Sequence, residues 1–131
     1  MRGNDWQGYF LSLLRVIAGA LFSCHGLQKL FGFFGGMGGH GAVAHIGSQM
    51  WIAGVLESVG GLLIVLGLFT RPVAFILCGE MAVAFFTVHY RRGFWPILNG
   101  GELAVLFCFL YLYFFAAGAG PISLDRAMRR K

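Results

Sequence analysis

The sequence predicts an all-α integral membrane protein built as a four-transmembrane-helix bundle. Of its 131 residues, 58% are hydrophobic and only 11% are charged, whereas about a quarter of an ordinary soluble domain is charged. Four apolar runs of helix length follow one another, and a helix needs roughly 20 apolar residues to cross a bilayer. Turn-forming residues separate the runs. Together these observations exclude a soluble globule, a disordered chain, a coiled coil and collagen.

The four expected spans cover roughly residues 9–34, 50–69, 72–90 and 97–117 of a single domain, residues 1–131. Glycines between residues 35 and 41 form the first break, and Pro72 stands near the start of the third helix. Arg91, Arg92 and Pro96 open the last gap. A secretory signal peptide is the alternative for the first run, but Arg15 interrupts its short apolar stretch and the apolar character then resumes.

The positive charges predict the orientation of the bundle. With four spans, both termini and the loop holding Arg71 lie on one side of the membrane. That side carries seven Lys and Arg residues: Arg2, Arg15, Arg71, Arg126, Arg129, Arg130 and Lys131. The other side carries only Lys29, Arg91 and Arg92. The positive-inside rule therefore predicts cytoplasmic termini in a multi-pass protein of the cell inner membrane.

The net charge of +5 does not indicate nucleic-acid binding. The basic residues lie at the ends of apolar runs and form no single patch, which is typical of contact with lipid headgroups. Near the C-terminus, Ser123 can cap a short helix from Leu124 to Lys131 whose basic residues suit an anionic inner leaflet.

Ionisable residues inside the spans are the candidate functional residues, because each is costly in hydrocarbon unless it faces a partner or a cavity. On the first helix, polar and small residues recur every three or four positions and so share one inward face. On the second helix, small residues share a face with Glu57 and allow close backbone approach. Six ionisable groups are expected toward the outer half of the bundle: His25, Lys29, Glu57, Glu80, His89 and Glu102.

Three interpretations of this polar set remain open. In the first interpretation, the set is a purely structural network in which Lys29 neutralises Glu57 or Glu102 and fixes helix register. Alternatively, it forms a polar pocket whose carboxylates and imidazoles exchange protons with a ligand such as a quinone, with aromatic walls from the phenylalanines at 31, 33, 34, 85 and 86. A metal or haem site is the third interpretation, but neither a Glu-x-x-His motif nor a haem-attachment motif occurs.

The three cysteines, Cys24, Cys78 and Cys108, have no C-x-x-C spacing. They therefore indicate neither a thioredoxin-like dithiol nor a zinc site, and they are interpreted as small packing residues. A meeting of two of them between helices stays open. His40 and His45 fall in the glycine-rich loop, where they are expected to be solvated.

Short motifs follow one another over almost the whole chain. They are HGLQKLFG at residues 25–32, Glu57 with the Gly-Gly pair at 60–61, LGLFTR at 66–71, EMA at 80–82 with His89, NGGE at 99–102 and GAGPISLD at 118–125. In this combination and order they resemble the DoxX family of small four-helix membrane proteins. The resemblance implies a link to quinone-dependent oxidoreduction, because the family is named after subunits associated with a terminal quinol oxidase and with thiosulfate:quinone oxidoreduction. Bacterial relatives are linked to quinone, catechol and thiol stress.

These observations favour a quinone-linked oxidoreductase subunit or a quinone-handling protein. His25 and Lys29 are expected to orient the head group, with Gln28, His89 and Asn99 as further ligand contacts. The proton-carrying groups would be the carboxylates Glu57, Glu80 and Glu102. Electrons would come from a protein partner, a bound cofactor or the substrate, and the protein could form homo-oligomers. The alternative is a non-enzymatic scaffold or assembly partner of a membrane redox or stress-response complex.

Overall fold

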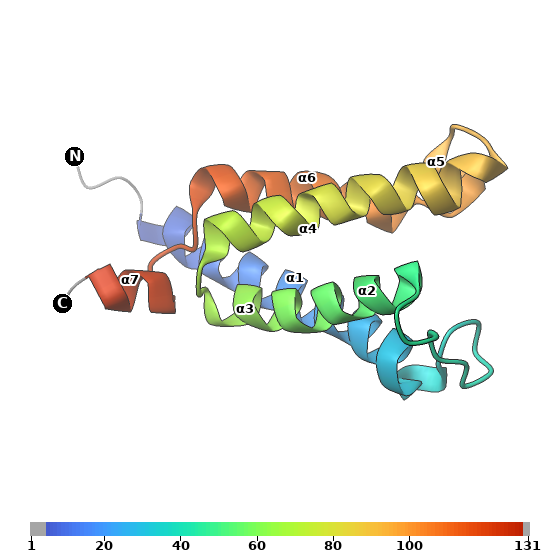
Figure 1. Cartoon of the computed structure of the whole chain (residues 1–131). Helices are drawn as coiled ribbons and strands as arrows, with labels where there is room; N and C mark the ends of the chain where they lie inside the picture. Colours follow the sequence, from blue (N-terminus) through green and yellow to red (C-terminus); the bar gives the residue numbers. More distant parts are fainter. Residues whose placement is uncertain (1–4, 130–131) are drawn as a thin grey trace. The chain divides into compact units, whose positions relative to one another are not determined.

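The computed structural model describes residues 5–129. All regular secondary structure in this range is helical, apart from an isolated β-bridge between Met37 and Ala42, so the predicted all-α class is confirmed (Figure 1). The described residues form two compact units. Unit 1 comprises residues 5–70 and 119–129, and unit 2 comprises residues 71–118; each is described by itself.

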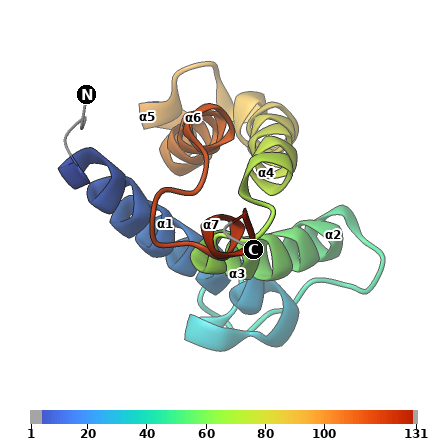
Figure 2. The same cartoon turned by 90° about the vertical axis from the view of Figure 1, so that its left-hand side faces the viewer.

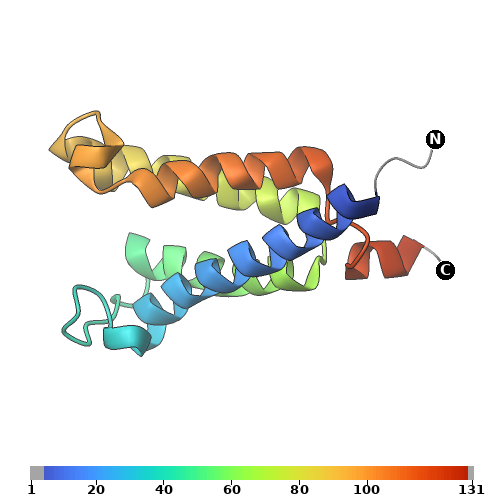
Figure 3. The same ribbon diagram turned by 180° about the vertical axis from the view of Figure 1, so that it is seen from behind.

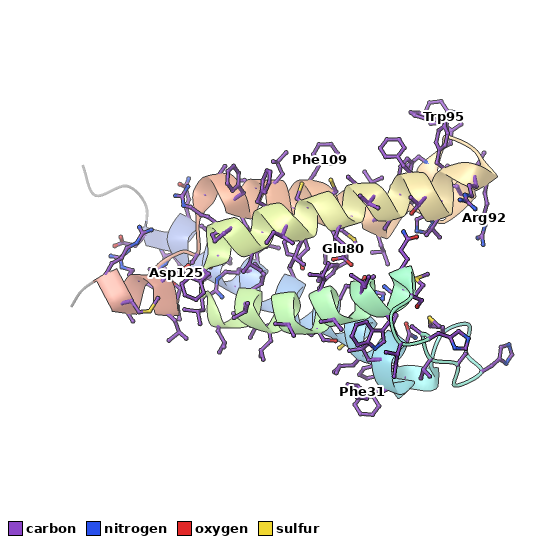
Figure 4. The ribbon with its side chains drawn as sticks, viewed as in Figure 1. Phe31, Glu80, Arg92, Trp95, Phe109 and Asp125 are labelled. Atoms are coloured by element: carbon purple, nitrogen blue, oxygen red, sulfur yellow. The ribbon has the colours of Figure 1, made fainter. Side chains whose placement is uncertain are left out.

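Long apolar helices account for most of the described chain. Three helical segments are long and apolar enough to cross a membrane: Asp5–Phe31, Gln49–Leu66 and Thr70–Arg92. A further apolar helix, α6 (Glu102–Ala117), is shorter, with 16 residues. Large apolar side chains such as Leu13, Phe75 and Phe109 are more than half exposed, and Figure 4 shows Phe109 projecting outward from α6. These outward faces suit lipid better than water.

Helix α1 (Asp5–Phe31) opens unit 1. Its buried side chains confirm the predicted inward face: Ser12, Arg15, Ala18, Gly19, Phe22 and Gly26. The helix ends at Phe31 because Gly32 adopts a left-handed conformation with φ 72°. The apolar run indicated a helix to residue 34, but the structure places Phe33–Gly35 in a separate 3-10 helix, η1.

The loop after η1 is tied back to α1. The backbone N–H of Ala44 donates to the carbonyl of Lys29 at 2.8 Å, and that of Gly41 donates to the carbonyl of Gly35 at 2.6 Å. His40 and His45 are exposed on this loop. The loop therefore adjoins the end of α1 that carries Lys29.

The second helix of unit 1 consists of three joined segments, α2 (Gln49–Val55), η2 (Leu56–Gly60) and α3 (Gly61–Leu66). The Ser48 hydroxyl caps its start by accepting the N–H of Trp51 at 3.2 Å. Gly67 stops it in the left-handed conformation, with φ 66°. The middle segment η2 is a π-helix, a wider turn that frequently occurs at functional sites. Figure 3 shows α1 running alongside α2 and α3.

The C-terminal segment returns to unit 1 and ends in α7 (Leu124–Arg129). The Ser123 hydroxyl accepts the N–H of Arg126 at 3.2 Å, which confirms the predicted cap. The N–H of Asp125 donates to the carbonyl of Gly67 at 2.9 Å, so α7 adjoins the end of α3 (Figure 2). The predictions for Arg2, Arg130 and Lys131 lie outside the described residues.

Unit 2 is a helical hairpin. Helix α4 (Thr70–Ala84) continues through the π-helix η3 (Phe85–His89) and the 3-10 helix η4 (Tyr90–Arg92). A short α5 (Pro96–Asn99) follows, and α6 then runs back along α4 (Figure 1). The apolar run indicated one helix over residues 97–117, but Gly100 breaks it with φ 75°. At the open end of the hairpin, Arg71 donates to the carbonyls of Phe115 at 3.2 Å and Ala116 at 3.0 Å.

Candidate functional site

Glycines bring the backbones of α1 and the second helix into close contact. A Cβ added to Gly19 would lie 2.7 Å from the carbonyl oxygen of Gly61 and 2.8 Å from the backbone nitrogen of Val65. A Cβ added to Gly26 would lie 2.7 Å from the carbonyl oxygen of Gly54. These distances leave no room for a side chain. The close approach predicted from the small-residue faces is therefore present.

Lys29 and Glu57 form an ion pair at this helix contact. The Lys29 ammonium donates to Glu57 Oε1 at 2.5 Å and to Oε2 at 2.6 Å. The Glu57 side chain is 2% exposed and the Lys29 side chain 19%. Glu57 also lies in the π-helical turn η2, whose widened backbone displaces it from the ordinary helical register. Of the two groups, the Lys29 ammonium is therefore the more accessible one.

The other predicted ligand contacts of unit 1 lie close by in sequence. His25 precedes Lys29 by four residues, which places both on one face of α1. His25 and Gln28 are both half-buried. Of the predicted site residues in unit 1, the structure thus joins Lys29 directly to Glu57 and places His25 one turn before Lys29 on α1.

In unit 2, His89 and Asn99 come together. The Nδ1 of His89 lies 3.3 Å from the carbonyl oxygen of Asn99, and because a carbonyl only accepts, Nδ1 carries the proton in this bond. Asn99 is 1% exposed. Its side-chain amide donates to the carbonyl of Gly93 and accepts the N–H of Gly101, both at 2.8 Å. Asn99 therefore fixes the turn between α5 and α6 and positions His89, which ends the second π-helix.

Two further predicted carboxylates belong to unit 2. Glu80 is half-buried on α4, where Figure 4 labels it. Glu102 is exposed and is the first residue of α6, a position where the helix dipole favours a negative charge. Among residues 5–129, no group of three or more His, Cys, Asp or Glu side chains is arranged to hold a metal ion.

The predicted aromatic residues differ in exposure. Phe31, Phe33 and Phe34 are all more than half exposed at the end of α1, where the rings of Phe31 and Phe33 lie 5.7 Å apart. In unit 2, Phe85 is 9% exposed and Phe86 is 62% exposed. Phe85 is therefore buried, whereas the other four are mostly exposed.

Arg15 has a structural role that the sequence did not indicate. It is 1% exposed. Its guanidinium donates to four backbone carbonyls of unit 1: Ile64, Val65, Ala119 and Ile122. The first two lie in the last turn of α3, where the Ile64 carbonyl also accepts the N–H of Gly67 at 3.1 Å, and the last two belong to the returning C-terminal segment. Arg15 belongs to the face of the first helix that was predicted to point inward, and its charge is used inside unit 1.

Asp125 adds a second set of contacts next to those of Arg15. Its carboxylate accepts the backbone N–H of Phe69 at 2.8 Å and of Thr70 at 2.9 Å, which caps the start of α4. It also interacts electrostatically with the Arg15 guanidinium. The GAGPISLD motif therefore has a physical explanation, since its last residue bridges a helix start and a buried cation. In the sequence, the signal for this arrangement is that Arg15 lies on the inward face of the first helix, which otherwise carries mainly small residues.

Replacing Asp125 with alanine is expected to lower the free energy of unfolding by about 1 kcal/mol, because two N–H donors at the start of α4 lose their acceptor. Asp125→Asn keeps one acceptor oxygen and should lose less. Detergent-induced unfolding followed by tryptophan fluorescence measures both. An alanine variant as stable as the parent would show that the cap does not contribute.

Comparison with known proteins identifies the family. A family model described as DoxX matches residues 10–90. An uncharacterized protein of Haemophilus influenzae is 46% identical over 132 aligned residues, which cover 98% of this chain and 97% of that protein. A Bacillus subtilis protein named "Putative oxidoreductase CatD" is 28% identical over 113 residues, which cover 86% of this chain and 82% of that protein. No solved structure matches the chain. This chain, with its long apolar helices, belongs to the DoxX family of membrane proteins.

Proposed function

We propose that the protein crosses the inner membrane four times, with both termini in the cytoplasm. Three helices have sufficient length. The 16 residues of α6 rise about 24 Å at 1.5 Å per residue, and α5 with the Gly100 turn extends this segment toward the roughly 30 Å hydrocarbon core. Among the described residues, Arg71, Arg126 and Arg129 lie on the side proposed to be cytoplasmic, which supports this orientation.

We further propose that the protein is a quinone-linked oxidoreductase subunit or quinone-handling protein. The observation that carries this proposal is the Lys29–Glu57 pair. A lysine ammonium has three N–H donors, and the two carboxylate oxygens of Glu57 account for two of them. The third can donate to a quinone carbonyl oxygen. The relative named as an oxidoreductase supports the same class of function.

The pair fits the chemistry of quinone reduction, which consumes two protons together with two electrons. Lys29 holds a proton beside the site, and once Lys29 has donated it, the Glu57 carboxylate can take up a proton from water and pass it to Lys29 through their shared contact. His25, one turn away on α1, is a second proton-carrying group. Glu80, Glu102, His89 and Asn99 stay predicted site residues in unit 2, and the predicted homo-oligomer and redox partner proteins belong to the same proposal.

The test is the binding of ubiquinone-1 to the purified protein in lipid nanodiscs. Lys29→Met removes a charge-assisted hydrogen bond to the quinone and should weaken binding about tenfold. Glu57→Gln should weaken it as well, because Lys29 then loses its partner charge. Arg92→Met is the matched control, since Arg92 is an exposed cation that Figure 4 places at the end of unit 2.

A double variant separates binding from stability. Removing one partner of a buried ion pair leaves an uncompensated charge, whereas replacing both by apolar residues is often neutral for stability. Lys29→Met with Glu57→Leu should therefore fold normally and still bind quinone weakly. If this folded double variant binds ubiquinone-1 as tightly as the parent protein does, the ion pair only stabilises the helix contact. The alternative function, a non-enzymatic scaffold, is then favoured.

A further inference from the structure

Two cysteines 30 residues apart in sequence meet inside unit 2. The Sγ of Cys78 on α4 lies 3.7 Å from the Sγ of Cys108 on α6, and both thiols are reduced. A disulfide has an S–S length near 2.0 Å, so bond formation requires a relative approach of about 1.7 Å. Rotation about the two Cα–Cβ bonds supplies movements of this size. No large displacement of α4 or α6 is needed.

The antiparallel register of α4 and α6 places the two cysteines next to each other. Arg71 at the start of α4 is bonded to the carbonyl of Ala116, and Cys78 lies seven residues further along α4 while Cys108 lies eight residues back along α6. Seven or eight residues are about two helical turns, so both helices present the same side again at the cysteines. The rings of Phe75 and Phe115, 5.3 Å apart, occupy the interval between the two contacts.

The thiols are close to each other and also accessible. Cys78 and Cys108 are both half-buried, whereas the preceding residues Leu77 and Phe107 are 1% and 8% exposed. The two thiols are thus less enclosed than the residues that precede them. Their partial exposure lets a small molecule reach the two thiols.

We propose that Cys78 and Cys108 form a redox-active dithiol that delivers two electrons to a membrane quinone. In this step two S–H bonds break and one S–S bond forms. The two electrons and two protons pass to the two carbonyl oxygens of the quinone, which becomes the hydroquinone. This inference rests on the proposed quinone function, and it supplies the electron carrier for which the sequence has no nucleotide or haem motif. A thiol reductant returns the disulfide to the dithiol.

The experiment uses the purified full-length protein in nanodiscs without oxygen. Samples receive either diamide, a thiol-specific two-electron oxidant, or ubiquinone-1, whose fully substituted ring has no C–H position for thiol addition. Free thiols are then labelled and the peptides are mapped. Both oxidants should produce a monomer in which Cys78 and Cys108 are linked, and ubiquinone-1 should yield one hydroquinone per chain.

Three alanine variants give the matched controls. Cys78→Ala and Cys108→Ala should abolish both the cross-link and hydroquinone formation, whereas Cys24→Ala, which changes a cysteine of unit 1, should retain both. Alanine is chosen because a buried cysteine behaves as a small apolar residue. A parent protein that forms no cross-link with diamide would overturn the proposal.

The quinone step has its own decisive outcome. A cross-link with diamide but none with ubiquinone-1 would overturn the transfer of electrons to quinone. Quinone binding is measured separately in the Cys78→Ala/Cys108→Ala protein. If binding there still depends on Lys29, the proposed function stands although the dithiol proposal fails; if no binding occurs, the proposed function fails as well.

Discussion

Replacing Arg15 with methionine is expected to lower the free energy of unfolding by about 3–5 kcal/mol, because several buried carbonyls lose a charged donor at about 1–3 kcal/mol each. Arg15 is 1% exposed and serves four backbone carbonyls. Methionine fills a similar volume but donates no hydrogen bond. The carbonyls of Val65, Ala119 and Ile122 would lose the guanidinium donor, Ile64 would keep only the N–H of Gly67, and Asp125 would lose its neighbouring positive charge.

Lysine is not expected to rescue this position. The planar guanidinium directs its donors over a wide fork, and Nε, Nη1 and Nη2 all make bonds here. A lysine ammonium concentrates three donors at one atom and cannot span carbonyls of both α3 and the C-terminal segment. Arg15→Lys should therefore remain destabilised even though the charge is kept.

The matched control is Arg71→Met. Arg71 also donates to backbone carbonyls, those of Phe115 and Ala116, but it is exposed. Its loss should cost no more than about 1 kcal/mol, as for exposed charged contacts. Unfolding in mixed micelles, followed by tryptophan fluorescence, measures all three variants. Equal stabilities of Arg15→Met and Arg71→Met would contradict the role given to Arg15.

Gly19→Ala is expected to be the second most damaging change, with a loss of about 1–3 kcal/mol or more from overpacking. The added Cβ would meet the carbonyl oxygen of Gly61 and the backbone nitrogen of Val65, at 2.7 and 2.8 Å. Backbone atoms cannot move aside as the end of a flexible side chain can. The two helices would have to separate, which would also lengthen the Lys29–Glu57 contact.

The same substitution at Gly79 should have the opposite sign. A Cβ at Gly79 has no neighbour within 4 Å, and this glycine lies inside α4 without a positive φ. Gly79→Ala should therefore stabilise the protein by about 0.5–1 kcal/mol, because alanine loses less backbone entropy in a helix. The same unfolding measurement compares the two variants. If both changes had the same sign, close packing at Gly19 would not be the cause.

Much of unit 1 could be predicted from residue periodicity. The face of α1 that repeats every three or four residues is the buried face, and the glycines that share a helix face with Glu57 lie in the close contact. The pairing of Lys29 with Glu57 was one of two alternatives, Glu57 or Glu102. Periodicity assigns residues to a face but not to a partner. Only the spatial contact selected Glu57.

The positions of glycines determine where the helices end more accurately than the lengths of the apolar runs do. Gly32 and Gly100 end helices inside runs of apolar residues, because a left-handed residue stops the helical hydrogen-bond pattern. The two π-helical segments also had no signal in the hydrophobic pattern. They depend on backbone hydrogen-bond register, which the surrounding packing decides.

The sequence by itself determined the all-α class, the apolar helices, the family and the inward face of α1. These properties follow from the composition and from the helical repeat, which are local quantities. The tertiary structure decided the four-carbonyl anchor of Arg15, the cap by Asp125 and the meeting of Cys78 with Cys108. Each of these joins residues far apart in the chain, and their contact depends on how the helices pack, which the local pattern of a single helix does not specify.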